Sequence, residues 1–163
     1  NTEESIMKTA STHQIKKLNV TISELHDSAG LVYVGAVVSK ADLASYLSQL
    51  SMVLGDDFTR YRKNQSIRDH NSFHITLINP YEYKEIEPNN VKFGQQISVT
   101  LQGIGIAKEK NKTSYFVVTN SMQGQKYRQK LSLKHKDLHV TLGFDPQDVY
   151  SVSKDQSSLL KYQ

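Results

Sequence analysis

Two segments of the sequence share a pattern of residues that can transfer protons and bind phosphate. Residues 70–77 and residues 135–142 both read His-x-x-apolar-His-β-branched-Thr-Leu, and the step from position 74 to position 139 is an offset of 65 residues. A proline follows each copy within a few residues, and a predicted helix precedes each copy at some distance. The repetition indicates that the chain contains a duplicated unit.

Strand alternation predicts which side chains of each copy are available for chemistry. Successive side chains of a strand point to opposite faces, so His74 and Thr76 share one face, as do His139 and Thr141. The apolar residues between them must face the core, which leaves the histidines and threonines on an open face. If the two copies meet across a pseudo-twofold axis, two imidazoles and two hydroxyls line one groove.

This set of groups suits cleavage of a phosphodiester without a metal ion. A neutral histidine accepts a proton from the attacking water or hydroxyl, and a protonated histidine donates one to the leaving oxygen. The ordinary imidazole pKa of about 6.5 makes both forms accessible near neutral pH. Threonine hydroxyls donate hydrogen bonds to phosphate oxygens as charge builds up on them. We therefore predict His74, His139, Thr76 and Thr141 as catalytic residues, and the pseudo-symmetry leaves the acid and base roles open.

The other histidines allow a competing interpretation. His70 and His135 create two His-x₃-His spacings, which bind zinc when they lie on a helix. Both pairs run into β-branched strand residues and share no fixed glutamate pattern, so we predict no metal site and no cofactor. We expect His70 and His135 to support the site or face solvent, and His13 and His26 to lie on the surface.

Hydrophobic periodicity predicts the elements that must position these residues. Apolar alternation or short apolar runs predict strands, and a helical repeat of apolar residues from 40 to 54 predicts a helix. The predicted strands cover residues 18–22, 31–38, 73–78, 97–106, 115–119 and 138–144, and a second helix covers 121–134. We predict a loop or short irregular helix for residues 56–71 and a loop for residues 81–90. We predict flexible tails for residues 1–14 and 151–163. The order favours a single α+β domain with helices outside antiparallel sheet.

Composition narrows the class of protein. The chain has 163 residues, 37% hydrophobic and 22% charged, with no cysteine and a formal net charge of +4. Cysteine nucleophiles, disulfides and thiolate metal sites are therefore excluded. No apolar stretch approaches the length of about 18 residues that a membrane span needs. We expect a cytoplasmic monomer, and the mild positive charge permits a small anionic ligand more readily than duplex DNA.

The paired motifs resemble those of the 2H phosphoesterase superfamily. Residues 74–77 (His-Ile-Thr-Leu) and 139–144 (His-Val-Thr-Leu-Gly-Phe) carry the match. The chain looks closest to the Swiss army knife RNA-repair-like and small bacterial or phage branches. It looks less like the bacterial 2′–5′ RNA ligase-like branch, because residues 78–81 (Ile-Asn-Pro-Tyr) replace the aromatic, leucine and glycine that follow the first motif there.

The resemblance implies two pseudo-symmetric lobes of antiparallel sheet around a cleft, and a metal-independent phosphodiesterase. Its substrates would be 2′,3′-cyclic phosphates, or 2′–5′ or cyclic linkages of RNA-derived molecules, so an RNA end or small nucleotide is the expected partner. Two alternatives stay open: a nucleotide- or RNA-binding module without catalysis, and an RNA 2′–5′ ligase.

Aromatic and basic residues near the motifs are candidates for substrate binding. Aromatic rings stack on nucleotide bases without regard to sequence, and lysine or arginine attracts phosphate. Arg68 and Lys136 lie just before the two His-x-Thr strands. The aromatic candidates are Tyr81, Tyr115 and Phe144, with Tyr83 and Tyr150 as further possibilities.

Overall fold

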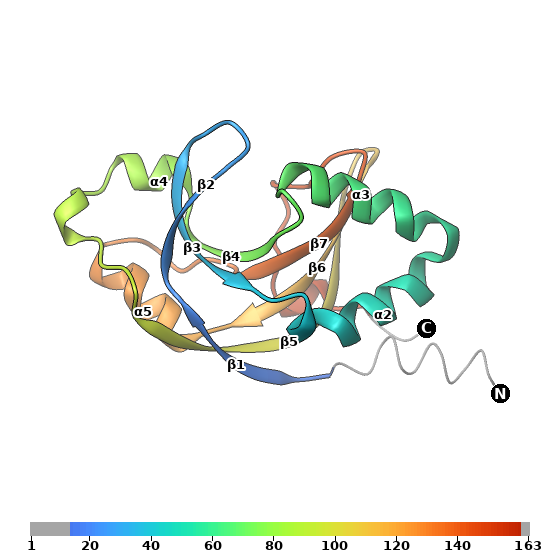
Figure 1. The fold of residues 1–163 in the computed structure, drawn as a ribbon, viewed down its shortest axis with the longest axis horizontal. Helices are drawn as coiled ribbons and strands as arrows, with labels where there is room; N and C mark the ends of the chain where they lie inside the picture. The colour runs from blue at the N-terminus through green and yellow to red at the C-terminus, as the bar shows by residue number, and fades with distance from the viewer. Residues whose placement is uncertain (1–13, 161–163) are drawn as a thin grey trace.

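One curled antiparallel sheet organises the fold. The computed structural model describes residues 14–160, in which seven strands follow the order β1-β5-β6-β7-β4-β3-β2 (Figure 1). The strands are β1 (Lys16–Thr21), β2 (Ser23–His26), β3 (Val32–Val38), β4 (Phe73–Ile78), β5 (Gln96–Glu109), β6 (Lys112–Asn120) and β7 (His139–Asp145). The predicted α+β class and all six predicted strands are confirmed, and β2 is an additional strand.

Helices connect the strands and cover the sheet. The α-helices are α2 (Ala44–Leu54), α3 (Phe58–Arg68), α4 (Pro80–Lys84) and α5 (Met122–Lys130). Short 3₁₀ turns are η1 (Ala41–Leu43), η2 (Gly55–Asp57), η3 (Pro88–Asn90) and η4 (Gln156–Ser158). Both predicted helices are confirmed, the second with a shorter span. None of the helices in residues 14–160 is long and apolar enough to cross a membrane.

The prediction of a loop or short irregular helix for residues 56–71 is wrong, because α3 occupies most of this segment. Phe58 and Tyr61 of α3 pack against the core, but the one fully buried residue of the helix is polar. Gln65 is fully buried, and its amide donates to the backbone carbonyl of Ser72 at 2.9 Å and to the Asp69 carboxylate at 2.8 Å. A search for apolar periodicity cannot detect a helix whose buried face is satisfied by hydrogen bonds.

The predicted loop over residues 81–90 also contains helical structure. Asn79 caps α4 by accepting a hydrogen bond from the backbone N–H of Glu82, and the Glu82 carboxylate accepts one from the backbone N–H of Asn79. Pro80 occupies the first helical turn, where its missing N–H costs nothing. This capping box was visible in the sequence.

The duplicated units meet in the middle of the sheet. Each unit consists of a hairpin, a helical segment and a final strand: β2, β3, α2–α3 and β4 in the first, and β5, β6, α5 and β7 in the second. The final strands β4 and β7 pair with each other, so both units form one continuous sheet (Figure 1). The apolar side chains of β4 and β7 join the main core with those of α2, including Leu50. This packing covers the face opposite the histidines.

Each unit sends an arginine to the final strand of the other unit. Arg62 on α3 donates through Nη1 to the backbone carbonyl of Leu142 on β7. Arg128 on α5 donates through Nη1 to the backbone carbonyl of Leu77 on β4, at 2.7 Å. Leu77 and Leu142 occupy the same position of the repeated motif. We call this pair of contacts the arginine interlock.

The segment that follows β7, residues 146–160, packs against the molecule, so the prediction of a flexible tail is wrong for residues 151–160. Val149 and Lys154 are buried, and Val149 joins Phe116 in a second small apolar cluster. Leu159 forms an isolated β-bridge with Gly105 of β5. The predicted tails over residues 1–13 and 161–163 lie outside the described residues. We refer to residues 146–160 as the C-terminal segment.

The arginine interlock predicts a large stability effect for Arg128→Met. Arg128 is 2% exposed and also binds the Glu82 carboxylate at 2.8 and 3.0 Å, so its loss strands a partly buried carboxylate and the Leu77 carbonyl. We expect the free energy of unfolding to fall by about 3–5 kcal/mol in urea denaturation. The control, Lys126→Met on the exposed face of α5, should change it by about 0.5 kcal/mol or less. Equal losses in the two variants would contradict a structural role for the interlock.

Candidate active site

The candidate active site is built on the junction of β4 and β7. Ile75 pairs with Val140 across these antiparallel strands, and both side chains are fully buried. Because the neighbours of a buried strand residue point to the other face, each histidine lies opposite the threonine of the other repeat. The resulting cross-strand pairs are His74 with Thr141 and Thr76 with His139. The predicted pseudo-twofold meeting of the motifs is thus present at the backbone level.

The cross-strand register also sets the spacing of the two imidazoles. His74 and His139 are diagonal neighbours on one face, which corresponds to a Cα separation of about 7–8 Å. Rings that extend from such positions can both reach one group held between them. Thr76 and Thr141 occupy the other diagonal, so the two hydroxyl groups flank the same point.

His74 lies beside an aromatic ring and near a carboxylate. Its ring centroid is 5.4 Å from that of Tyr33 on β3. Burial lowers the pKa of His74, the negative charge of Asp69 acts in the opposite direction, and the positive charge of Arg68 lowers the pKa again. Asp69 therefore favours a proton on His74 against the effect of burial.

A hydrogen bond to the backbone of Asp137 holds the His139 ring in one orientation. Its Nδ1 lies 3.0 Å from the carbonyl oxygen of Asp137, and because a carbonyl only accepts, Nδ1 carries the proton and donates. The neutral ring then has its lone pair on Nε2, the atom that can accept a proton. Burial lowers the pKa of His139 well below the ordinary value, and the positive charge of Lys154 lowers it further.

The two histidines and two threonines of the motifs line a cleft of about 1040 Å³. The β2–β3 hairpin forms one wall, and the C-terminal segment contributes to another. Of the predicted site residues, eight line this cleft, one of them the further aromatic candidate Tyr150: His74, Thr76, His139, Thr141, Arg68, Lys136, Tyr81 and Tyr150. His26, His70 and His135 also line it, and all three are exposed as predicted. His13 lies outside the described residues.

Two aromatic candidates for base stacking are buried elsewhere. Tyr115 is 8% exposed, and its ring meets that of Tyr61 on α3 with centroids 5.6 Å apart. Phe144 is 5% exposed, and the guanidinium of Arg68 lies 4.9 Å from the centre of its ring. Neither side chain lines the cleft. The prediction that these two residues bind substrate is therefore corrected, because packing already occupies their faces.

Tyr81 and Lys136 both line the cleft, but Tyr81 is exposed whereas Lys136 is held by hydrogen bonds. Tyr81 is 71% exposed at the start of α4. Lys136 is held by Gln125, whose side-chain amide donates to the Lys136 carbonyl at 2.7 Å and accepts from its N–H at 3.1 Å. The Lys136 ammonium is 3.9 Å from the Glu82 carboxylate, and burial lowers the Lys136 pKa. Tyr83, a further aromatic candidate, packs against the main core.

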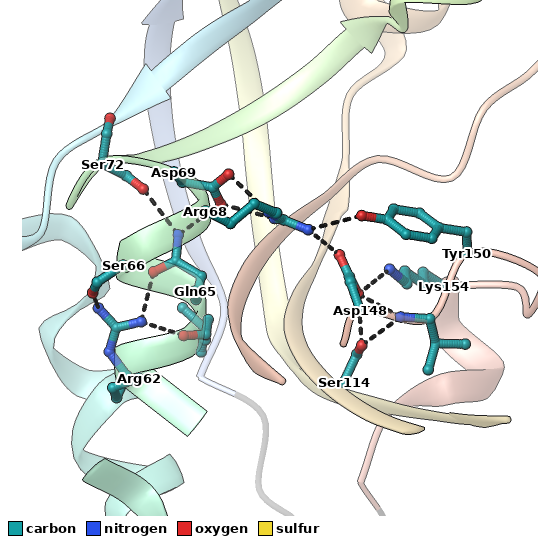
Figure 2. Close-up of polar contacts among 12 residues, drawn as sticks. Arg62, Gln65, Ser66, Arg68, Asp69, Ser72, Ser114, Asp148, Tyr150 and Lys154 are labelled. Atoms are coloured by element: carbon teal, nitrogen blue, oxygen red, sulfur yellow. Dashed lines mark hydrogen bonds and ion pairs between the residues drawn. The ribbon is translucent and has the colours of Figure 1, made fainter. Parts of the chain in front are cut away.

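Arg68 is already engaged by carboxylates, as Figure 2 shows. Its guanidinium donates to both oxygens of Asp69 at 2.8 Å and to Asp148 at 2.5 Å. The Tyr150 hydroxyl accepts a longer hydrogen bond from Arg68 at 3.3 Å. The positive charge that the sequence suggested for binding phosphate is therefore shared with two negative charges.

Sequence reasoning did not single out Asp148 and Lys154. Asp148 is 4% exposed and accepts hydrogen bonds from Ser114 at 2.5 Å and from the Lys154 ammonium at 3.1 Å (Figure 2). Burial alone would raise the Asp148 pKa, but Lys154 and Arg68 outweigh it and hold the pKa below its usual range. The polar segment after Asp145-Pro146 reads as solvent-exposed, so no signal in the sequence marked either residue.

The two His-x₃-His spacings do not lie on a helix. Asp69 ends α3, and His70 follows in a left-handed turn with φ of 54°, ahead of His74 on β4. Within residues 14–160, no group of three or more histidine, aspartate or glutamate side chains is arranged to hold a metal ion.

Comparison with known protein families agrees with this geometry. The family model of the Swiss Army Knife 2H phosphoesterase domain matches residues 39–150, which include both His-x-Thr strands and both interlock arginines. The chain belongs to this 2H phosphoesterase family. Searches of curated proteins and of solved structures found no match. The match ends at residue 150. Lys154, a buried residue that lines the cleft of this 2H phosphoesterase, therefore lies outside the matched region.

The lowered pKa of His139 predicts a specific loss of stability in acid. Between the folded pKa and the ordinary value of about 6.5, the unfolded chain binds more protons at this position, so stability falls as pH falls. His139→Asn should reduce this dependence by up to about 1.4 kcal/mol per pH unit between about pH 6.5 and pH 4. Urea denaturation at several pH values measures it.

The control for this measurement is His26→Asn, because His26 is exposed on β2. Asp148 does not obscure the result, since its lowered pKa acts on stability only below about pH 4. The same pH dependence in wild type and His139→Asn would contradict a neutral, partly buried His139.

Proposed function

We propose that this 2H phosphoesterase is a metal-independent phosphodiesterase acting on 2′,3′-cyclic phosphates, or on 2′–5′ or cyclic linkages of small RNA-derived molecules. The observation that carries the proposal is the pairing of Ile75 with Val140, which sets both His-x-Thr motifs on one face that lines one cleft. Family membership supports phosphoester chemistry in general, and the site supports the two-histidine mechanism.

The proposed reaction needs one proton acceptor, one proton donor and donors for the phosphate. One histidine takes a proton from water as the water oxygen forms a bond to phosphorus. The other histidine gives a proton to the leaving oxygen as the old P–O bond breaks. The hydroxyls of Thr76 and Thr141 donate to the non-bridging oxygens, where negative charge increases in the transition state. No electron transfer is involved, and one water is consumed for each bond cleaved.

The charge of the cleft supports a small substrate over a long nucleic acid. Cations and carboxylates nearly balance there: the cations are Arg68, Lys136 and Lys154, and the carboxylates are Asp27, Asp69, Asp137 and Asp148. Binding of a polyanion depends on many unpaired basic groups that release counterions. Two of these three cations are paired with Asp148, so one phosphodiester fits this cleft better than an extended strand.

An apolar surface that suits a nucleoside lies beside the proposed phosphate position. Leu25, Tyr33 and Val37 line the cleft from the β2–β3 hairpin, and Tyr81 lies exposed at its edge. Aromatic side chains stack on bases of any sequence. We propose that Tyr81 contacts the base or ribose.

Turnover in excess EDTA tests the proposal. The substrates are the four nucleoside 2′,3′-cyclic monophosphates, 2′–5′ dinucleotides and cyclic dinucleotides, with products resolved by chromatography. We expect at least one substrate to be cleaved, His74→Ala and His139→Ala each to lower kcat by about 10²–10⁴-fold, and the double variant to be inactive. Thr76→Ala and Thr141→Ala should lower kcat more than they raise KM.

Thr59→Ala, an exposed substitution on α3, is the matched control and should keep full activity. Saturable binding of these ligands without turnover would support the binding-module alternative. Joining of cleaved ends would support the ligase. Turnover that the double histidine variant retains, or that EDTA abolishes, would contradict the two-histidine mechanism.

A further inference from the structure

The C-terminal segment places a buried lysine beside one of the two histidines. The side chain of Lys154 is 6% exposed, and its ammonium lies 3.1 Å from the Asp148 carboxylate. The residue lines the cleft together with His139. The C-terminal segment lies beyond the repeated motif, so Lys154 has no equivalent position in the first repeat, and the cation near His74 is Arg68 at the end of α3.

Backbone contacts tie Lys154 to the loop that orients His139. The backbone N–H of Lys154 donates to the Asp137 carboxylate at 3.1 Å. The backbone carbonyl of the same Asp137 accepts the hydrogen bond from Nδ1 of His139. Asp137 therefore connects the C-terminal segment directly to the imidazole, and the position of Lys154 relative to His139 is fixed by hydrogen bonds.

Lys154 and His139 also pack around one aromatic ring. The Lys154 ammonium lies 5.4 Å from the centre of the Phe116 ring, and the His139 ring meets it edge-on with centroids 5.7 Å apart. Protonation of His139 would add a positive charge to a cluster that already contains the Lys154 ammonium, whose side chain is only 6% exposed, and like charges repel more strongly at such a site than in bulk solvent. The arrangement opposes protonation of His139.

The charges around the two histidines differ. Those near His139 are Lys136 and Asp137 from the preceding loop, Lys154 and Asp148 from the C-terminal segment, and Arg68, Asp69, His74 and His135 from the rest of the cleft. Burial lowers the pKa of His139 most, and Lys154 and then Lys136 lower it further, whereas the hydrogen bond to the Asp137 carbonyl and the charge of Asp148 raise it. For His74, the strongest influence after burial is the carboxylate of Asp69, which favours the proton.

We propose that Lys154 is a positioning residue that keeps His139 neutral, so that His139 accepts the proton of the attacking water and His74 donates one to the leaving oxygen. In the reaction, Nε2 of His139 takes the water proton as the new P–O bond forms. His74 loses its proton to the leaving oxygen as the old bond breaks, and exchange with solvent restores both rings. The division of roles rests on the proposed function, whereas the effect of Lys154 on His139 does not.

NMR titration of the histidine rings tests the effect of Lys154 without any substrate. In the wild-type protein, we expect His139 to titrate below His74. In Lys154→Met, the titration midpoint of His139 should rise by about one pH unit or more, a tenfold change in proton affinity. Lys154→Arg keeps the positive charge and should keep the low midpoint. Lys130→Met, at the exposed end of α5, is the matched control and should leave it unchanged.

The pH profile of kcat/KM tests the consequence for catalysis. The acidic limb, where the base becomes protonated, should move to higher pH in Lys154→Met and stay in place in Lys154→Arg and Lys130→Met. A purely structural role would lower kcat/KM at every pH without moving the limb.

The outcomes separate this inference from the proposed function. Wild-type His139 titrating above His74, or an unchanged His139 midpoint in Lys154→Met, would overturn the inference, and the wild-type measurement stands even if that variant fails to fold. A shifted midpoint together with no turnover of any substrate would support the effect of Lys154 and reject the phosphodiesterase.

Discussion

The short pairing between β4 and β7 is the constraint on which the site depends. Each repeat contributes one strand to this junction, and Ile75 and Val140 must both be buried there. A slip of one residue in either strand would turn its histidine and threonine into the core and its apolar residues into the cleft. Burial of the apolar side chains therefore sets the register, and the register brings the two histidines and two threonines to one face.

The arginine interlock stabilises this junction from outside the sheet. Arg62 and Arg128 each leave their own repeat and donate to a backbone carbonyl of the other repeat, at equivalent positions. A charged donor to a buried carbonyl is a strong contact, and its loss leaves the carbonyl without a partner. Because the exchange is reciprocal, each repeat supplies the side-chain donor for one carbonyl of the other repeat's final strand, which adds to the β4–β7 pairing that joins the two units.

Symmetry of the backbone does not extend to the charges. Asp69, which lies between α3 and the first motif, is near His74, whereas Lys154 of the C-terminal segment is near His139. Asp148 links the two environments, since it binds both Arg68 and Lys154 (Figure 2). The segments around the duplicated motif thus give its two histidines different electrostatic environments. Such a difference is what allows one histidine to act as an acid and the other as a base.

The sequence by itself determined the repeat, the six main strands and the four residues of the two motifs, because alternation and repetition are local patterns that survive without knowledge of contacts. Tertiary structure decided α3, whose buried face holds Gln65, and the placement of Phe144 and Tyr115 in packed positions. It also decided the position of Lys154, which lies in a polar stretch that reads as solvent-exposed. The reason is the same in each case: polar groups become buried only where distant parts of the chain supply their hydrogen bonds and charges, and no local pattern records those partners.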